Sequence, residues 1–180
     1  MVPDVPAAGL ASLVGLARSA LVAALRGEPA PAPRDPGAPR GAFVTLRKGG
    51  VLRGCIGHPH PDRPVAELVC EMAVAAALDD PRFPAVTLDE LAEITVEVSV
   101  LTPPRRLIPV DPALLEVGRH GLMLRHGGAS GLLLPQVAVE HGLDATAFLE
   151  AVCRKAGLGA GAWRRPGAEV LVFETEVFGE

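Results

Sequence analysis

Two pairs of short apolar segments, each joined by a double glycine, constrain the fold of this chain most strongly. The pairs occupy residues 43–56 and 121–134, and their glycine doublets begin at Gly49 and Gly127. Because glycine adopts the positive φ angles that tight hairpin turns need, both pairs are predicted to be β-hairpins. Hairpin strands run antiparallel, so the sheet is expected to be largely antiparallel.

The rest of the chain alternates between helical and strand periodicity. Apolar residues at helical spacing predict helices over 10–25, 64–76 and 145–156. Alternation of apolar and polar residues predicts a strand over 94–101, and a final strand is expected over 168–177. Hairpins and helices follow one another without the regular rhythm of βαβ units. This order predicts an α+β fold in which helices pack on largely antiparallel sheets.

Prolines and capping residues mark further boundaries. The segment 28–40 contains five prolines, which exclude helix and disfavour sheet pairing, so we expect a loop there. Thr87-Leu-Asp-Glu90 has the capping-box pattern that starts a short helix. Asp111 is predicted to cap another short helix that ends at Gly118. At 180 residues the chain fits one domain, so we expect residues 1–180 to form a single domain with 28–40 as a loop within it.

Composition excludes several classes of function. A net charge of −4 and an aromatic content of 3% argue against a general nucleic-acid binder, which needs cationic surface and stacking rings. The apolar stretch from Leu10 to Leu25 contains Arg18, lacks a basic leader and is short for a bilayer, so no membrane span is expected. Three cysteines without close pairs indicate reduced thiols. Together these features predict a cytoplasmic protein.

The segment Leu52-Arg-Gly-Cys-Ile-Gly57, called the signature below, is the strongest candidate for a functional site. Gly54 and Gly57 suggest a tight, exposed bend near the end of a strand, where another group can approach the backbone. A nearby cation such as Arg53 would favour the thiolate form of Cys55. The commoner use of a single cysteine is as a small buried hydrophobic residue. We expect Arg53 to face a ligand and Cys55 to be mainly structural.

Two further groups of residues could assist the signature. Cys55, His58 and His60 are metal-ligand types, but no partner pair follows later in the chain and the intervening prolines resist a compact loop, so we expect no bound metal. Asp79, Asp80 and Glu97 offer carboxylates that could meet Arg53 across the fold. The alternative is that these acids pair structurally with arginines, for example as a buried Arg53–Asp80 pair.

The assembled residues resemble the AMMECR domain family, named for a human chromosomal region and called protein A of the AmmeMemoRadiSam system in bacteria. The resemblance covers nearly the whole chain. It rests on Phe43–Arg47, on the signature, on Asp79–Pro84 with Glu97–Leu101, and on Gly131–Ala138.

This resemblance implies an α+β fold of two interleaved subdomains with the signature at the cleft between them. It also implies two bacterial partners, a Memo-like protein and a radical S-adenosylmethionine protein. It supplies no reaction and no cofactor. His58 and His60 fall in a stretch that varies within the family.

Two classes of function stay open at this stage. In the first, the protein is a binding or accessory component that holds a substrate, such as a small anionic ligand, for its partners. In the second, it is an enzyme whose catalytic candidates are Arg53, Cys55 and Glu97. In either case, the residues expected to bind the ligand are Arg53, Gly54, Cys55, Gly57, Asp79, Asp80, Arg82 and Gln136.

Overall fold

The computed structural model describes residues 7–180, with side chains described from Leu13 onward. The chain divides into two compact units. The first unit comprises residues up to Val100 together with Glu176–Glu180, and the second comprises Leu101–Thr175. The first unit is therefore discontinuous in sequence. Both units combine helices with β-sheet, which confirms the α+β prediction.

The first unit is a four-stranded sheet with two long helices. Its helices are α1 (Ala7–Arg26) and α2 (Val65–Leu78), with a short 3₁₀ turn, η1 (Leu88–Glu90). Its strands are β1 (Ala42–Lys48), β2 (Val51–His58), β3 (Ile94–Leu101) and β8 (Thr175–Gly179), in the order β2-β1-β3-β8. β1 pairs antiparallel with both β2 and β3.

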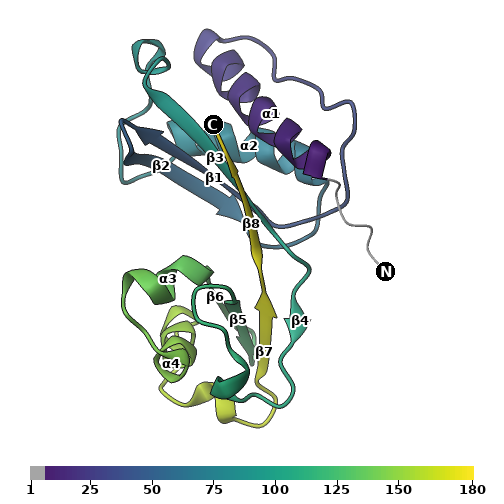
Figure 1. Ribbon diagram of the computed structural model, residues 1–180, viewed down its shortest axis with the longest axis vertical. Coiled ribbons are helices and arrows are strands. Elements are labelled where there is room, and N and C mark those ends of the chain that lie inside the picture. Colours follow the sequence, from purple (N-terminus) through teal and green to yellow (C-terminus); the bar gives the residue numbers. More distant parts are fainter. Residues whose placement is uncertain (1–6) are drawn as a thin grey trace. The chain divides into compact units, whose positions relative to one another are not determined.

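The core of the first unit lies between the sheet and these helices. Figure 1 shows α1 and α2 side by side on one face of the sheet. Alternate residues of β1 point into this core, including Val44 and Leu46, both fully buried. The helices contribute residues such as Leu21 and Leu68. The opposite face of the sheet carries the remaining residues of each strand, and it includes the signature cysteine.

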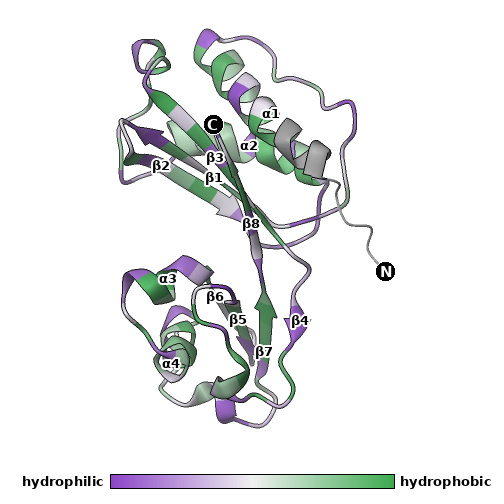
Figure 2. Ribbon diagram, in the orientation of Figure 1, coloured by the Kyte–Doolittle hydropathy of each residue, from purple (hydrophilic) through white to green (hydrophobic). Residues whose placement is uncertain are grey.

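The second unit is another four-stranded sheet, covered by shorter helices. Its strands are β4 (Arg105–Arg106), β5 (Gly121–His126), β6 (Ala129–Leu133) and β7 (Glu169–Phe173), in the order β4-β7-β5-β6 with antiparallel pairing throughout. Its helices are α3 (Pro135–Glu140) and α4 (Ala145–Lys155), with 3₁₀ turns η2 (Pro112–Leu114) and η3 (Ala162–Arg164). β7 is hydrophobic, whereas the short edge strand β4 is hydrophilic (Figure 2).

Most of the expected elements are present with similar bounds. The double-glycine turns have positive φ angles, for example 55° at Gly49 and 57° at Gly127. The strand expected over 94–101 is β3. The segment 28–40 contains no helix and no paired strand, apart from an isolated bridge between Pro39 and Pro64. None of the helices in the described part of the chain is both long and apolar enough to span a bilayer.

Two expectations about elements were wrong, and one helix was missed. The single strand expected over 168–177 is two strands, β7 and β8, which are separated by Glu174 and belong to different sheets. The helix after Asp111 ends at Leu114 rather than at Gly118. The helix α3 was not expected at all. It begins with Pro135, whose fixed φ suits the first turn of a helix.

Candidate functional site

The signature lies on β2, an edge strand of the first unit's sheet, and the strand continues through it. Leu46 of β1 opposes Gly54, while Arg47 opposes Leu52, so Arg53 is the extra residue of a β-bulge. A bulge leaves one residue unpaired and redirects its side chain. The bulge therefore explains why Arg53 turns out of the sheet toward the loop that precedes β3.

The two signature glycines are required by close packing rather than by a bend. Neither has a positive φ, so the expected tight turn is absent. A Cβ at Gly54 would lie 2.1 Å from the carbonyl oxygen of Ala76 in α2. A Cβ at Gly57 would lie 2.1 Å from the ring of Phe43. The glycines let a helix and an aromatic ring rest directly on the strand's backbone.

Asp80 fixes the edge of β2 at Cys55. Its carboxylate is buried and accepts the backbone N–H of Cys55 at 2.8 Å. It also accepts three hydrogen bonds from Arg82, from the backbone N–H at 3.1 Å and from Nε and Nη2 at 2.9 and 2.7 Å. These Arg82 bonds hold the pKa of Asp80 well below its usual range. Arg82 Nη2 also donates to the Cys55 carbonyl at 3.1 Å, so both backbone groups of Cys55 are covered by the loop.

Arg53 forms a second clasp between β2 and the same loop. Its Nε and Nη2 donate to the two carboxylate oxygens of Glu90 at 3.0 and 2.9 Å. Nη1 donates to the carbonyl of Pro84 at 2.8 Å, and Nη2 also donates to that of Ala85 at 3.3 Å. The bond from Arg53 is the main reason that the pKa of Glu90 is lowered to about 2. All three guanidinium nitrogens of Arg53 thus have protein acceptors.

These contacts revise the expected roles of the signature's charged residues. A buried Arg53–Asp80 pair is not formed, because Asp80 pairs with Arg82 and Arg53 pairs with Glu90. The sequence did contain the signal for Glu90, which completes the expected capping box through its bond to the Thr87 N–H. That carboxylate serves the local cap and the distant arginine together. Only the local role could be derived from spacing.

The side chain of Cys55 lies in a row with two others on the sheet face opposite the helices. Thr45 of β1 is the Cα partner of both Cys55 in β2 and Glu97 in β3. The Thr45 hydroxyl donates to Cys55 Sγ at 3.3 Å. Thr45 is buried, and Cys55 and Glu97 are half-buried. Thr45 was not among the expected residues, because counting back from the glycine turn places Val44 opposite Cys55, and only the bulge at Arg53 shifts the pairing to Thr45.

The other sequence candidates lie apart from this row. Asp79 is exposed at the end of α2, with no side-chain bond to any described residue. His58 Nε2 lies 3.0 Å from Asp62 Oδ2, and its ring packs edge-on to that of His60. The described residues include no group of three His, Cys, Asp or Glu side chains placed to hold a metal ion. Gln136 is exposed on α3 in the second unit, so its convergence with the signature stays a prediction.

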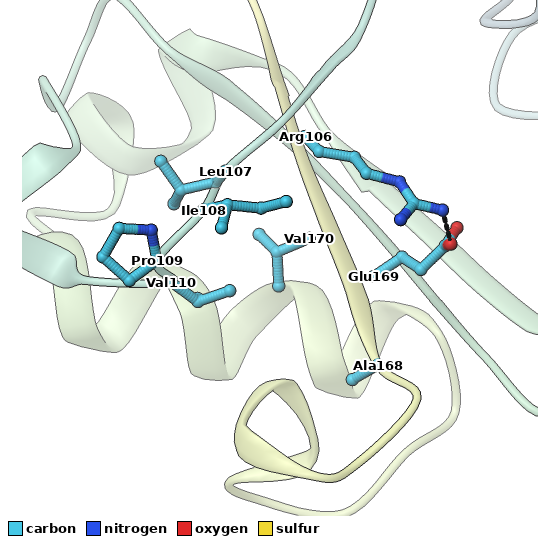
Figure 3. Close-up of a pocket in the computed structure, with 8 residues that line it drawn as sticks. All are labelled: Arg106, Leu107, Ile108, Pro109, Val110, Ala168, Glu169 and Val170. Atoms are coloured by element: carbon cyan, nitrogen blue, oxygen red, sulfur yellow. Dashed lines mark hydrogen bonds and ion pairs between the residues drawn. The ribbon is translucent and has the colours of Figure 1, made fainter.

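The second unit contains a small cavity beside its edge strand. It has a volume of about 140 Å³ and is lined mainly by apolar side chains, among them Leu107, Ile108 and Val170. Figure 3 shows its polar rim, where Arg106 and Glu169 pair with each other. These two charges pair with each other at the rim, and the rest of the lining is mainly apolar. It is a weaker candidate than the signature row.

Comparison with known proteins agrees with this fold. The AMMECR1 family model matches residues 14–178. A protein of Methanosarcina mazei is 50% identical over 144 residues, which cover 78% of this chain and 72% of the relative. A protein of Methanopyrus kandleri is 47% identical over 179 residues, which cover 93% of this chain and 86% of the relative.

A solved structure supports the same conclusion. The crystal structure of an uncharacterized protein from Pyrococcus horikoshii has a TM-score of 0.83 and 43% sequence identity, and the match covers 94% of this chain and 90% of that one. The names of these relatives state no activity. The match to the family model over almost the full length, together with this level of identity, establishes the family: the chain belongs to the AMMECR1 family.

Proposed function

We propose that this chain is a cytoplasmic binding component that acts with a Memo-like protein and a radical S-adenosylmethionine protein. The observation that carries the proposal is that the polar groups of the signature and its loop are hydrogen-bonded within the protein. Arg53 and Asp80 fix backbone and loop, and the Cys55 thiol contacts a hydroxyl rather than a base. The signature thereby builds a rigid surface on an edge strand.

A catalytic cysteine needs more than this row supplies. Nucleophilic thiols are activated by an adjacent base or by a strongly electropositive setting. Within the described part of the chain, no imidazole or carboxylate is hydrogen-bonded to Cys55 Sγ. The nearest histidine in sequence, His58, is engaged with Asp62. A preorganised surface suits binding, because rigid groups lose little conformational entropy when a ligand or partner docks.

The second candidate function is an enzyme that uses the same face. One observation favours it: the thiol, the hydroxyl of Thr45 and the carboxylate of Glu97 share one row. Measuring the alkylation rate of Cys55 against pH separates the candidates. A rate that follows an ordinary thiol titration supports binding, whereas fast labelling well below neutral pH supports catalysis.

Co-purification tests the proposed function. The tagged full chain is co-expressed with the Memo-like and radical S-adenosylmethionine proteins encoded in its own genome, and the eluate is analysed for both. We expect at least one to co-elute, and to be lost when the signature face is changed by Glu97→Lys. Glu93→Lys is the matched control, since Glu93 is exposed just before β3 and, among the described residues, its side chain pairs with Lys48 alone. Elution of the folded chain without either protein would contradict the proposal.

A further inference from the structure

Glu97 is a carboxylate near the middle of an interior strand, and it has no partner among the described residues. β3 lies between β1 and β8, and Glu97 is flanked along the strand by the buried residues Val96 and Val98. Its side chain is half-buried, yet it forms no hydrogen bond or ion pair with any described residue. Burying part of a charge without a partner is unfavourable. A carboxylate kept in this position is available for a group from outside the chain.

Arg82 provides an available cation beside the same row. Its Nε and Nη2 are engaged by Asp80 and the Cys55 carbonyl, but Nη1 has no acceptor among the described residues. The side chain is 53% exposed. Its pKa is raised mainly by the hydrogen bonds to the Asp80 carboxylate. The guanidinium therefore lies at the backbone of Cys55, and its Nη1 is engaged by none of the described residues.

The distance between these two charges can be estimated from the spacing of the strands. Strands in a sheet lie about 4.8 Å apart, so Cys55 and Glu97, two strands apart, are separated by about 10 Å. The thiol of Cys55 and the side chain of Thr45 lie between the charged ends. Arg82 Nη2 lies a further 3.1 Å away from the Cys55 carbonyl, which makes the span between the charged ends about 13 Å. Hydrogen bonds of about 2.8 Å at both ends would leave about 7 Å between the ligand's own charged groups. An extended chain advances about 3.3–3.6 Å per residue, so this is about the length of a dipeptide.

We propose that the signature face binds a linear zwitterion of about this length, with its carboxylate on Arg82 and its ammonium on Glu97. The inference rests on the proposed function, because the ligand would be what the binding component presents to its partners. Asp80 holds the Arg82 guanidinium with two side-chain hydrogen bonds, so the anion-binding groups are preorganised. Arginine's planar fork suits a carboxylate, and a carboxylate such as Glu97 accepts readily from an ammonium group.

A series of amino acids that differ only in length tests this inference. The full chain, labelled with ¹⁵N, is titrated at low salt with glycine, 4-aminobutyrate and 6-aminohexanoate, and separately with hexanoate and hexylamine. Amide shifts give both the dissociation constant and the location. We expect 6-aminohexanoate to bind about tenfold more tightly than glycine or either single-charge compound, because only it can meet both charges. The shifts should centre on Thr45, Cys55 and Glu97.

Variants decide between the two ends of the site. Glu97→Gln should weaken 6-aminohexanoate about tenfold and leave hexanoate unchanged, while Arg82→Lys should weaken both compounds. Glu93→Gln is the charge-matched control and should change neither. Affinity that does not depend on length, or that is unaffected by Glu97→Gln, would overturn the inference, as would shifts centred elsewhere or absent at saturating probe. Those outcomes leave the co-purification result standing, so a failure here is distinguishable from a failure of the proposed function.

Discussion

Replacing Asp80 with alanine should destabilise the first unit far more than the same change at its neighbour. The Asp80 side chain is only 2% exposed and accepts four hydrogen bonds. Its loss leaves the Cys55 N–H without an acceptor at the sheet edge and removes the partner of Arg82. A buried donor left unpaired costs about 1–3 kcal/mol, and breaking a buried pair costs about 3–5 kcal/mol.

The expected cost lies between these limits. Since the Arg82 side chain is 53% exposed, water can solvate its guanidinium after the substitution, and the full penalty of a stranded buried charge does not apply. We therefore expect Asp80→Ala to lower the free energy of unfolding by about 3 kcal/mol. For a chain of this length, that corresponds to a fall of roughly 6–12 °C in melting temperature.

Urea unfolding at pH 7 is the assay, with Asp79→Ala as the matched control. Asp79 is exposed and its side chain bonds to no described residue, so its loss should change stability by less than about 0.5 kcal/mol. The difference between the variants should also depend on pH. The folded pKa of Asp80 is lowered, so its stabilisation is present above the unfolded pKa of about 3.9 and is lost as pH falls below it. Equal unfolding midpoints for the two variants at pH 7 would refute the conclusion that the hydrogen bonds of Asp80 stabilise the edge of β2.

Three further changes probe the same elements. Arg53→Ala should cost about 2–4 kcal/mol in urea unfolding, because its 13% exposed side chain holds Glu90 and two carbonyls; a loss below about 0.5 kcal/mol would favour a ligand-facing arginine. Gly54→Ala should abolish cooperative melting or cut the yield of folded chain, because its Cβ would lie 2.1 Å from the Ala76 oxygen; wild-type stability would show that α2 does not rest on the strand. Cys55 in the native chain should react with a thiol reagent no faster than a free thiol, and markedly faster labelling would contradict a mainly structural cysteine.

The features of the fold that were predicted correctly are the ones that local chemistry decides. The double glycines at Gly49 and Gly127 adopt positive φ angles in hairpin turns, and Gly157 does so at the end of α4. Asp144 caps α4 by accepting the N–H of Ala147, as its place before the apolar stripe predicts. Each of these signals is complete within a few residues, so a sequence can be interpreted there without knowledge of distant contacts.

The features that were predicted wrongly depend on contacts between residues that are distant in sequence. The segment 168–177 has the composition of one strand, and nothing local indicates that β7 and β8 join different sheets. At the change of sheet, Glu174 is held by Thr102, a residue that is distant in sequence. The Thr102 N–H donates to the Glu174 carbonyl, and the Thr102 hydroxyl accepts the Glu174 N–H. Such a choice depends on which distant strand is available.

In the candidate site, too, the sequence shows the residue types but not which residues they contact. Sequence analysis selected the signature because an arginine and a cysteine between glycines are uncommon in an ordinary strand. It assigned the ligand to Arg53, the residue with the most suitable chemistry, but the bulge turns that side chain toward Glu90 and two carbonyls. A guanidinium whose three nitrogens already have protein acceptors has fewer N–H groups to offer a ligand, so the role expected for Arg53 stays a prediction. Among the described residues, the polar groups of this face without a partner are Nη1 of Arg82, at the Cys55 end of the row, and the carboxylate of Glu97, two strands away, and the search for a function of this face begins with them.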